Sequence, residues 1–169
     1  YRVTLTLPRP AAQQRLSLPV WIPGSYMVRE FSRRLSRLRA TQGQRECRIE
    51  QLDKCSWQVH CEGNLPLVVV CEVYAFDTSV RAAFLDAQRG LFNGTSLCLR
   101  AEGRTHLPHT LELVAPKALP AWKVATGLAP LSVNAQGFGT YLAADYDELA
   151  DCPVELGDFW RGHFVACGV

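Results

Sequence analysis

Residues 18–31 read LPVWIPGSYMVREF, an apolar strand pattern that a turn cuts short. The apolar side chains that set the pattern fall at every second position: Leu16, Leu18, Val20 and Ile22. Such alternation is typical of a half-buried β-strand. Pro23 and Gly24 then predict a sharp change of direction, because proline fixes its own φ and glycine tolerates a positive φ.

Polar and aromatic side chains follow this turn at once: Ser25, Tyr26, Met27 and Arg29. A turn at the end of an apolar strand presents such groups from a rigid support, which is how binding loops are commonly built. The alternative is an ordinary corner between two strands with a packed tyrosine. The stretch by itself leaves both interpretations open.

The period of two recurs along the whole chain. Strands are expected at residues 1–7, 16–22, 33–41, 47–51, 55–61, 65–75, 79–85, 95–99, 110–114, 122–126, 138–142 and 159–167. The unbroken apolar run within residues 65–75 favours a central strand covered on both faces. One helical turn is expected at residues 145–149, capped by Asp145. Short strands separated by Gly, Pro and Asn predict an all-β fold, an antiparallel sandwich or twisted sheets.

Composition narrows the class of protein. The chain has 169 residues, 48% hydrophobic and 20% charged, which fits one globular domain and excludes disorder. No apolar run approaches the roughly 18 residues of a membrane helix, so no membrane span is expected. The chain starts at Tyr1 in strand pattern and runs in strand pattern to Val169. We therefore expect residues 1–169 to be a single β domain of a longer protein.

The seven cysteines have irregular spacing and form no CxxC pair, which argues against a thiolate zinc site. They are Cys47, Cys55, Cys61, Cys71, Cys98, Cys152 and Cys167. We interpret them as small, mostly buried side chains in a reducing compartment. This predicts a cytoplasmic protein, or a periplasmic one if a leader has been removed.

Two clusters of basic or metal-binding residue types have simple structural explanations. Five arginines, Arg29, Arg33, Arg34, Arg37 and Arg39, lack the interleaved aromatics of a nucleic-acid site. A solvated strand face is favoured, so no nucleic-acid partner is expected. His106 and His109 have the spacing of a metal-binding pair, but Pro108 between them favours a surface loop.

Two further segments have both a structural and a functional interpretation. Asn93–Ser96, NGTS, predicts a hairpin turn or a polar loop tip beside a ligand. Residues 145–155, DYDELADCPVE, form an acidic cluster that is either solvated or able to bind an ammonium group. No GxSxG nucleophile motif occurs.

Four segments in one order resemble the N-terminal domain of the glycyl aminopeptidase family of zinc metallopeptidases. They are WIPGSYMVREF at 21–31, YAFDTSVRAAFLD at 74–86, GLFNGTSLCL at 90–99 and YDELADCPVELG at 146–157. The resemblance spans essentially the whole chain. It implies an N-terminal β domain like that of aminopeptidase N, followed by a thermolysin-like domain with HExxH and often by a PDZ domain. It also implies that the parent enzyme removes N-terminal glycine or alanine from peptides.

This chain contains no HExxH, the motif that holds zinc and activates its water in such enzymes. No catalytic or metal-binding residue is therefore assigned to it, and zinc is expected in the catalytic domain that lies outside this chain. The chain is expected to be a noncatalytic domain. Its partners would be its own catalytic domain and the peptide substrate.

The resemblance implies that three loops line one wall of the substrate cleft. The candidate substrate-binding residues are Tyr26, Arg29, Asn93, Thr95, Asp151 and Glu155. A substrate α-amino group is cationic below a pKa near 8, and Asp151 or Glu155 can match it. Two alternatives remain: an independent β-sandwich module for a protein or carbohydrate, and a hydrolase that uses Asp151 and Glu155 or a Cys and His pair.

Overall fold

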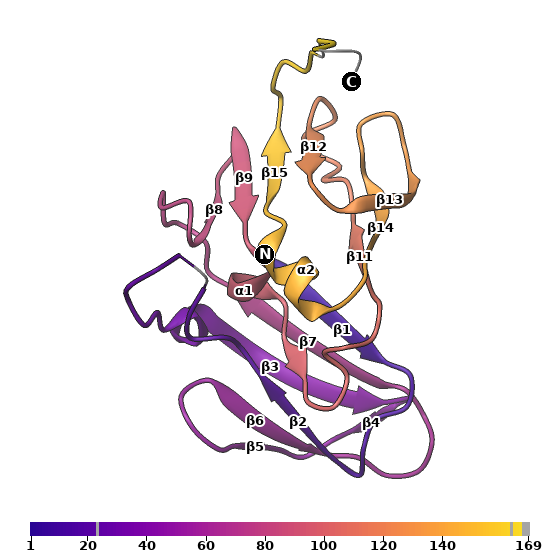
Figure 1. Ribbon diagram of the computed structural model, residues 1–169. Helices are drawn as coiled ribbons and strands as arrows, with labels where there is room; N and C mark the ends of the chain where they lie inside the picture. Colours follow the sequence, from indigo (N-terminus) through magenta and orange to yellow (C-terminus); the bar gives the residue numbers. More distant parts are fainter. Residues whose placement is uncertain (23, 163, 167–169) are drawn as a thin grey trace.

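The computed structural model describes residues 1–22, 24–162 and 164–166, and it consists mostly of antiparallel strands (Figure 1). They form four sheets, with strand orders β1-β7-β3-β4, β10-β2-β6-β5, β11-β14-β13 and β12-β15-β9-β8. The prediction of an all-β fold with antiparallel sheets is therefore confirmed. Pro23 of the predicted turn, Cys167, and His163 within the predicted strand at residues 159–167 lie outside the described residues.

The elements follow one another along the chain with these bounds: β1 (Arg2–Leu7), β2 (Gln13–Ser17), the 3-10 helix η1 (Phe31–Arg34), β3 (Leu35–Gln42), β4 (Arg45–Glu46), β5 (Ile49–Gln51), β6 (Ser56–His60), β7 (Leu67–Val73), β8 (Ala83–Leu85), β9 (Arg89–Phe92), α1 (Gly94–Leu97), β10 (Arg100–Ala101), β11 (His109–Leu113), β12 (Lys123–Thr126), β13 (Ala129–Val133), β14 (Gly139–Ala143), α2 (Tyr146–Asp151) and β15 (Val154–Gly157).

One apolar core runs through all four sheets. It extends from Leu16 on β2, through Val69 on β7, to Val154 on β15. Figure 1 shows the sheet of β1, β7 and β3 in the middle, with β2, β6 and β5 on one side and the strands β8, β9 and β11 to β15 on the other. The middle sheet therefore contributes to a core that it shares with both neighbouring groups of strands.

Strand β7 is central, as predicted, since it pairs with β1 on one edge and with β3 on the other. The prediction that both of its faces are covered is wrong. Burial alternates along the strand, with Leu67, Val69, Cys71 and Val73 buried and Val68, Val70 and Glu72 only half-buried. The apolar run is unbroken because Val68 and Val70, on the partly exposed face, are as apolar as the buried residues between them.

Several predicted strands have other boundaries. Strand β2 starts at Gln13 and ends at Ser17, because Pro19 has no N–H and the chain leaves the sheet into the loop at residues 18–30. The segment predicted at residues 79–85 becomes a strand only at Ala83, after a turn in which the Ala82 N–H donates to the Ser79 carbonyl. The described part of residues 159–167 contains no strand.

Five strands were not predicted: β4, β9, β10, β13 and β15. Each has only two to five residues, which is too short for a period of two to stand out. All five residues of β13 are exposed, so burial gives that strand no sequence signal.

The cysteines and the arginine run have simple surroundings where the chain is described. Six cysteines are free thiols, of which Cys47, Cys61 and Cys71 are buried and Cys55, Cys98 and Cys152 are half-buried. Burial raises the pKa of the Cys71 thiol to about 11 and that of Cys98 to about 12. The arginine run is solvated, with Arg34 paired to Asp77 and Arg37 to Glu72.

Candidate functional site

The loop at residues 18–30 is closed on itself by hydrogen bonds around Ser25. The Trp21 indole N–H donates to the Ser25 carbonyl at 2.6 Å, and the Arg29 N–H donates to the Val20 carbonyl at 2.6 Å. The Arg29 Nε lies 3.4 Å from the Ser25 hydroxyl, which is buried. Gly24 has φ of 74°, a conformation that glycine adopts without strain. The loop therefore has a defined shape before any partner binds.

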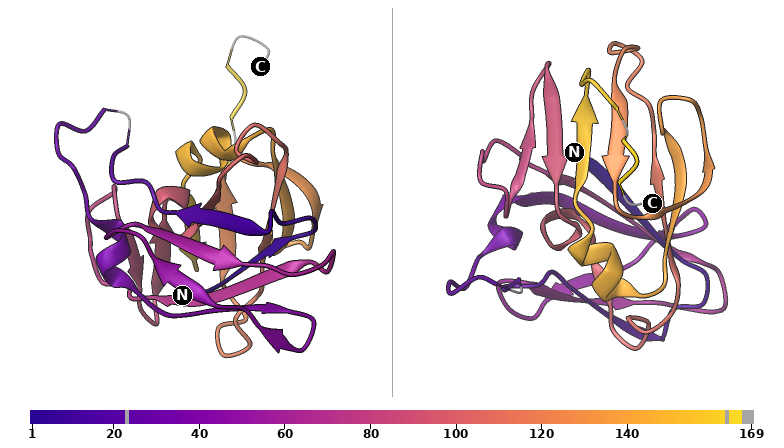
Figure 2. Two further views of the ribbon diagram at one scale, coloured as in Figure 1. Left: turned by 90° about the horizontal axis from the view of Figure 1, so that it is seen from below. Right: turned by 45° about the horizontal axis from the view of Figure 1, so that its top comes forward.

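The tip of this loop presents three consecutive apolar side chains to solvent. Tyr26 is fully exposed, and Met27 and Val28 are 65% and 72% exposed. Figure 2 shows the loop projecting from the body of the domain. Exposed apolar side chains on a fixed loop are typical of an interaction site. Arg29 lies just behind this tip, half-buried against Ser25.

The base of the loop is anchored to the rest of the domain. Glu30 forms an ion pair of 2.8 Å with Lys54, and this hydrogen bond lowers the pKa of the Glu30 carboxyl. The next element, η1, ends in Arg34, whose guanidinium pairs with Asp77 at 2.8 Å. The Arg34–Asp77 pair joins η1, the element directly after the loop, to the segment at residues 74–82.

Residues 74–82 carry a second group of exposed apolar side chains, which is not among the predicted site residues. Tyr74, Phe76 and Val80 are each more than 60% exposed. Phe76 stacks on Phe84 of β8 with ring centroids 5.2 Å apart. The only sequence signal for this surface was the motif YAFDTSV itself, because an exposed aromatic has no distinctive periodicity.

The segment at Asn93–Ser96 is a helical turn, α1, and the predicted strand at residues 95–99 is wrong. The Cys98 N–H donates to the Gly94 carbonyl at 2.7 Å, closing the turn. Gly94 is needed because α1 packs closely on α2: a Cβ at this position would lie 2.4 Å from the Leu149 carbonyl oxygen. A local alternation of apolar residues in TSLCL was overridden by this tertiary contact.

Asn93 and Thr95 have different surroundings at this turn. The Asn93 side-chain amide is half-buried and donates to the Val80 carbonyl at 2.8 Å, which ties α1 to the segment at residues 74–82. Thr95 is 4% exposed, and its hydroxyl has no hydrogen-bond partner among the described residues. Asn93 therefore lies at the surface, while Thr95 faces inward.

Helix α2 confirms the predicted helical turn and its cap. The Asp145 carboxylate accepts a hydrogen bond of 2.8 Å from the Glu148 N–H, and the Glu148 carboxylate accepts one from the Ala144 N–H. This pair is a variant of the capping box, in which the return bond comes from the residue before the N-cap and not from Asp145 itself. The helix runs two residues further than predicted and ends at Asp151, which is exposed.

Glu155 lies on β15, directly between its neighbouring strands. Its register partners are Leu91 on β9 and Ala125 on β12, and its own side chain is exposed. Val154, one residue earlier, pairs with Phe92, so the segment after Asp151 runs beside the Asn93 turn. The structure thus brings Asp151 and Glu155 to the same part of the fold as α1.

Helix α1 contacts α2 and also η1, the element that follows the loop at residues 18–30. No hydrogen bond or ion pair within the described ranges links Tyr26 or Arg29 directly to Asp151 or Glu155. Two groups of exposed candidate residues remain: an apolar loop tip at Tyr26 and an acidic edge, the name used here for Asp151 and Glu155.

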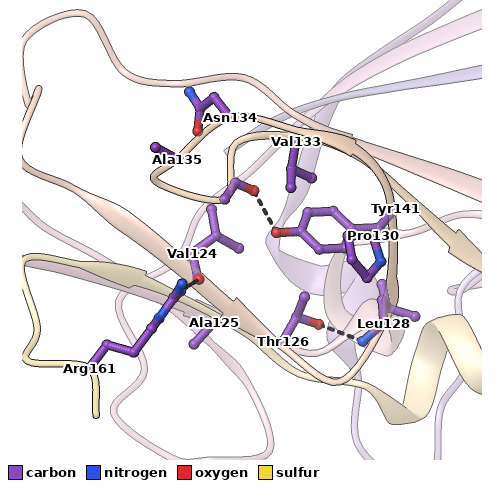
Figure 3. Close-up of a pocket in the computed structure, with 11 residues that line it drawn as sticks. Val124, Ala125, Thr126, Leu128, Pro130, Val133, Asn134, Ala135, Tyr141 and Arg161 are labelled. Carbon is purple, nitrogen blue, oxygen red and sulfur yellow. Dashed lines mark hydrogen bonds between the residues drawn. The ribbon is translucent and has the colours of Figure 1, made fainter. Parts of the chain in front are cut away.

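A hollow elsewhere in the domain lacks reactive groups. It has a volume of about 390 Å³ and lies between β12, the β13–β14 hairpin and Arg161. Figure 3 shows the Arg161 guanidinium donating to the Val124 carbonyl and the Tyr141 hydroxyl reaching back to the hairpin, where it donates to Gly137. The residues that line it include no carboxylate, histidine or cysteine, and none of the six predicted site residues.

Potential metal ligands are scattered. Among the residues that the structure describes, no three His, Cys, Asp or Glu side chains gather to hold an ion. His109 packs edge-on against Tyr146, while His106 is exposed. The residues present therefore do not fit a zinc site. No helix in the described ranges is long and apolar enough to cross a membrane.

Comparisons with known proteins agree with this architecture. The family model for the Peptidase M61 N-terminal domain matches residues 1–158. A crystal structure of an aminopeptidase N family protein from Idiomarina loihiensis has a TM-score of 0.95 and 42% sequence identity, covering 99% of this chain. This chain spans 28% of the length of that one. A search of curated proteins finds no match.

The family model and the similar crystal structure thus indicate the same family as the four sequence motifs did. The predicted resemblance to an N-terminal β domain of the aminopeptidase N type is confirmed. The chain belongs to the Peptidase M61 N-terminal domain family, and it is the N-terminal domain of an M61-type peptidase.

Proposed function

We propose that this domain is the noncatalytic N-terminal part of a zinc aminopeptidase that removes N-terminal glycine or alanine from peptides. It packs on the catalytic domain and forms one wall of the substrate cleft. The loop tip at Tyr26 and the acidic edge at Asp151 and Glu155 face the substrate in this proposal.

The observation that carries the proposal is the exposed tip of a loop with a fixed shape. Tyr26 is fully exposed, although Trp21 and Arg29 hold the backbone around it by hydrogen bonds. A preorganised loop loses little conformational entropy when it meets a partner, so its contacts add fully to binding. A tyrosine needed only for packing would be buried.

The acidic edge supports recognition of a substrate amine. Asp151 and Glu155 are exposed, and neither takes part in an ion pair within the described part of the chain. An unpaired carboxylate can accept a charge-assisted hydrogen bond from an α-ammonium group. Glycine and alanine lack a large side chain, so the amine supplies most of their binding energy at the N-terminal position.

The zinc chemistry is assigned to the neighbouring catalytic domain. The chain has no HExxH, and its described ligand-type side chains do not cluster. The bound metal would supply an activated water there. This domain's own residues would bind and orient the peptide and exclude bulk water from one side of the cleft.

The free thiols support a reducing compartment, and we propose a cytoplasmic location. Six cysteines carry no disulfide where the chain is described. Thiols persist in the cytoplasm, whereas disulfides form in the periplasm.

The test is steady-state kinetics of the full-length enzyme with Gly-containing peptides. Tyr26→Ala and Glu155→Ala should each raise KM several-fold while the melting temperature stays within about 2 °C of wild type, because exposed side chains contribute little to stability. Matched controls are Leu131→Ala, an exposed apolar residue on β13, and Glu46→Ala, an exposed carboxylate on β4. Unchanged kinetics with a lowered melting temperature would show that Tyr26 and Glu155 are structural.

A further inference from the structure

A long groove lies between the first strand of the chain and β11. It has a volume of about 1110 Å³, and every residue from Tyr1 to Arg9 and from Leu107 to Val114 lines it. Successive side chains of a strand point to opposite faces, so a cavity on one face would touch only every second residue. Consecutive lining residues mean that the groove follows the edges of the two strands.

Both strands end their sheets at this groove. β1 is the terminal strand of the order β1-β7-β3-β4, and β11 is the terminal strand of β11-β14-β13. Figure 1 shows β11 above β1, with β7 on the opposite side of β1. Two strand edges that lack a neighbour in the described structure therefore border the same hollow.

The hydrogen-bond phase of β1 shows which backbone groups face the groove. Tyr1 and Val73 exchange two hydrogen bonds of 2.8 Å, one in each direction. In an antiparallel ladder such pairs alternate with pairs that point away from the partner. The N–H and C=O groups of Arg2, Thr4 and Thr6 therefore point away from β7, toward the open edge.

The floor of the groove is apolar. Phe92, Leu99, Trp122, Phe138 and Leu156 line it and are buried. Val3 and Leu5 on β1, and Leu111 on β11, pack against the core but are only half-buried. These side chains therefore touch both the core and solvent, and a segment in the groove could bury them further.

The rim carries an excess of positive charge. Arg2, Arg9 and Arg104 line the groove, against the single carboxylate of Glu112. None of the three arginines forms an ion pair in the described ranges. The groove is therefore complementary to an extended segment with apolar side chains on one face and acidic ones on the other.

We propose that an extended segment of the same polypeptide, from outside residues 1–169, lies in this groove as an added strand between β1 and β11. It would pair with Arg2, Thr4 and Thr6, bury Val3 and Leu5 from solvent and place carboxylates near the three arginines. The inference rests on the proposed function only in that the domain is part of a longer peptidase.

Three arguments favour another segment of the same polypeptide, over a separate protein, as the occupant of the groove. The related aminopeptidase chain extends far beyond the matched part, which is 28% of its length. A tethered segment reaches the groove at an effective concentration in the millimolar range for a short flexible connection. An open strand edge beside apolar side chains also invites aggregation, and proteins commonly cover such edges themselves.

Amide hydrogen exchange of the full-length protein tests this inference. The N–H groups of Arg2, Thr4 and Thr6 should exchange at least about 100-fold more slowly than unstructured amides, since a paired edge opens only by local unfolding. Thr4→Pro removes one outward N–H without removing a bond to β7, so protection at Arg2 and Thr6 should fall at least about tenfold. Thr4→Ala, which keeps the N–H, is the matched control and should retain protection.

Exchange of these three amides near the unstructured rate in the wild-type protein would overturn the inference, and so would protection that Thr4→Pro leaves unchanged. If Thr4→Pro does not fold, Arg2→Glu combined with Arg104→Glu replaces it and should lower protection at Thr4 by repelling an acidic strand. Kinetics of Tyr26→Ala are measured on the same preparation. Fast exchange at the three wild-type amides together with a raised KM in Tyr26→Ala would reject the added strand and still support the proposed function.

Discussion

The indole N–H of Trp21 donates a 2.6 Å hydrogen bond to the backbone carbonyl of Ser25, across the loop that carries Tyr26. The bond spans the turn from one side to the other, so it fixes the direction in which the tip projects. Trp21 is itself half-exposed, which means that its main contribution is this bond and not burial. The shape of the exposed tip therefore depends on this side-chain donor together with the backbone bond from Arg29 to Val20.

Replacing this donor should loosen the loop without unfolding the domain. Trp21→Phe keeps an aromatic ring but removes the N–H, and a net hydrogen bond contributes about 0.5–1.5 kcal/mol. We expect a fall in melting temperature of roughly 2–4 °C and a higher KM in the full-length enzyme. Trp160→Phe, at an indole that is 89% exposed, is the control and should change neither. Equal effects of the two substitutions would show that the Trp21 bond does not shape the site.

The contact between α1 and α2 should tolerate no side chain at residue 94. In Gly94→Ala the new Cβ would meet the Leu149 carbonyl oxygen at 2.4 Å, so one helix must shift. Overpacking of this kind lowers the free energy of unfolding by about 1–3 kcal/mol. Urea unfolding measures it. In Gly127→Ala the new Cβ meets only the Cys152 sulfur at 3.4 Å, and this control should stay close to wild type. A wild-type midpoint for Gly94→Ala would contradict the close packing.

The capping box of α2 should support the acidic edge. Asp145→Ala removes the acceptor for the Glu148 N–H, and loss of such a cap costs about 1 kcal/mol. The expected result is a lower urea midpoint. Asp147→Ala, at an exposed position in the first turn of the same helix whose side chain accepts no capping bond, is the matched control. If both variants unfold at the same midpoint, the cap does not stabilise the helix.

The turn before β6 should make stability depend on acid. A hydrogen bond from the Ser56 hydroxyl, followed by one from the Cys55 N–H, lowers the pKa of the Asp53 carboxyl to about 2. A lowered pKa in the folded state adds stability above the ordinary pKa near 4, and this stability is lost as the pH falls toward about 2. Asp53→Asn should flatten the decline of unfolding free energy over this range. A decline as steep as that of wild type would exclude Asp53 as its source.

The sequence predicted the parts of the fold in which local pattern and tertiary environment agree. Strand β7 is central, as its apolar run predicted, and Asp145 caps α2 because the residues that form the cap lie within four positions of each other. The alternation at residues 95–99 misled because Gly94 lets α1 approach Leu149, a contact that no local pattern encodes. Strand β13 is wholly exposed and so carries no burial signal.

The candidate site could be predicted only in part for a related reason. The WIPGSY turn indicates a presenting loop, and Tyr26 is indeed exposed at its tip. The inward position of Thr95 could not be foreseen, because it depends on how α1 packs between η1 and α2. The exposure of Phe76 and Val80 could not be predicted, because an exposed apolar residue does not change the periodicity of the sequence.

Photo-crosslinking from position 26 tests the central claim most directly. A benzophenone amino acid replaces Tyr26 in the full-length enzyme, and a peptide with an N-terminal glycine and a non-hydrolysable first bond is the probe. Leu131, exposed on β13, carries the same group as control. The account predicts a crosslink to the peptide from position 26 alone, which excess substrate prevents. Absence of that crosslink, or an equal crosslink from position 131, would contradict the claim that this domain forms a wall of the substrate cleft.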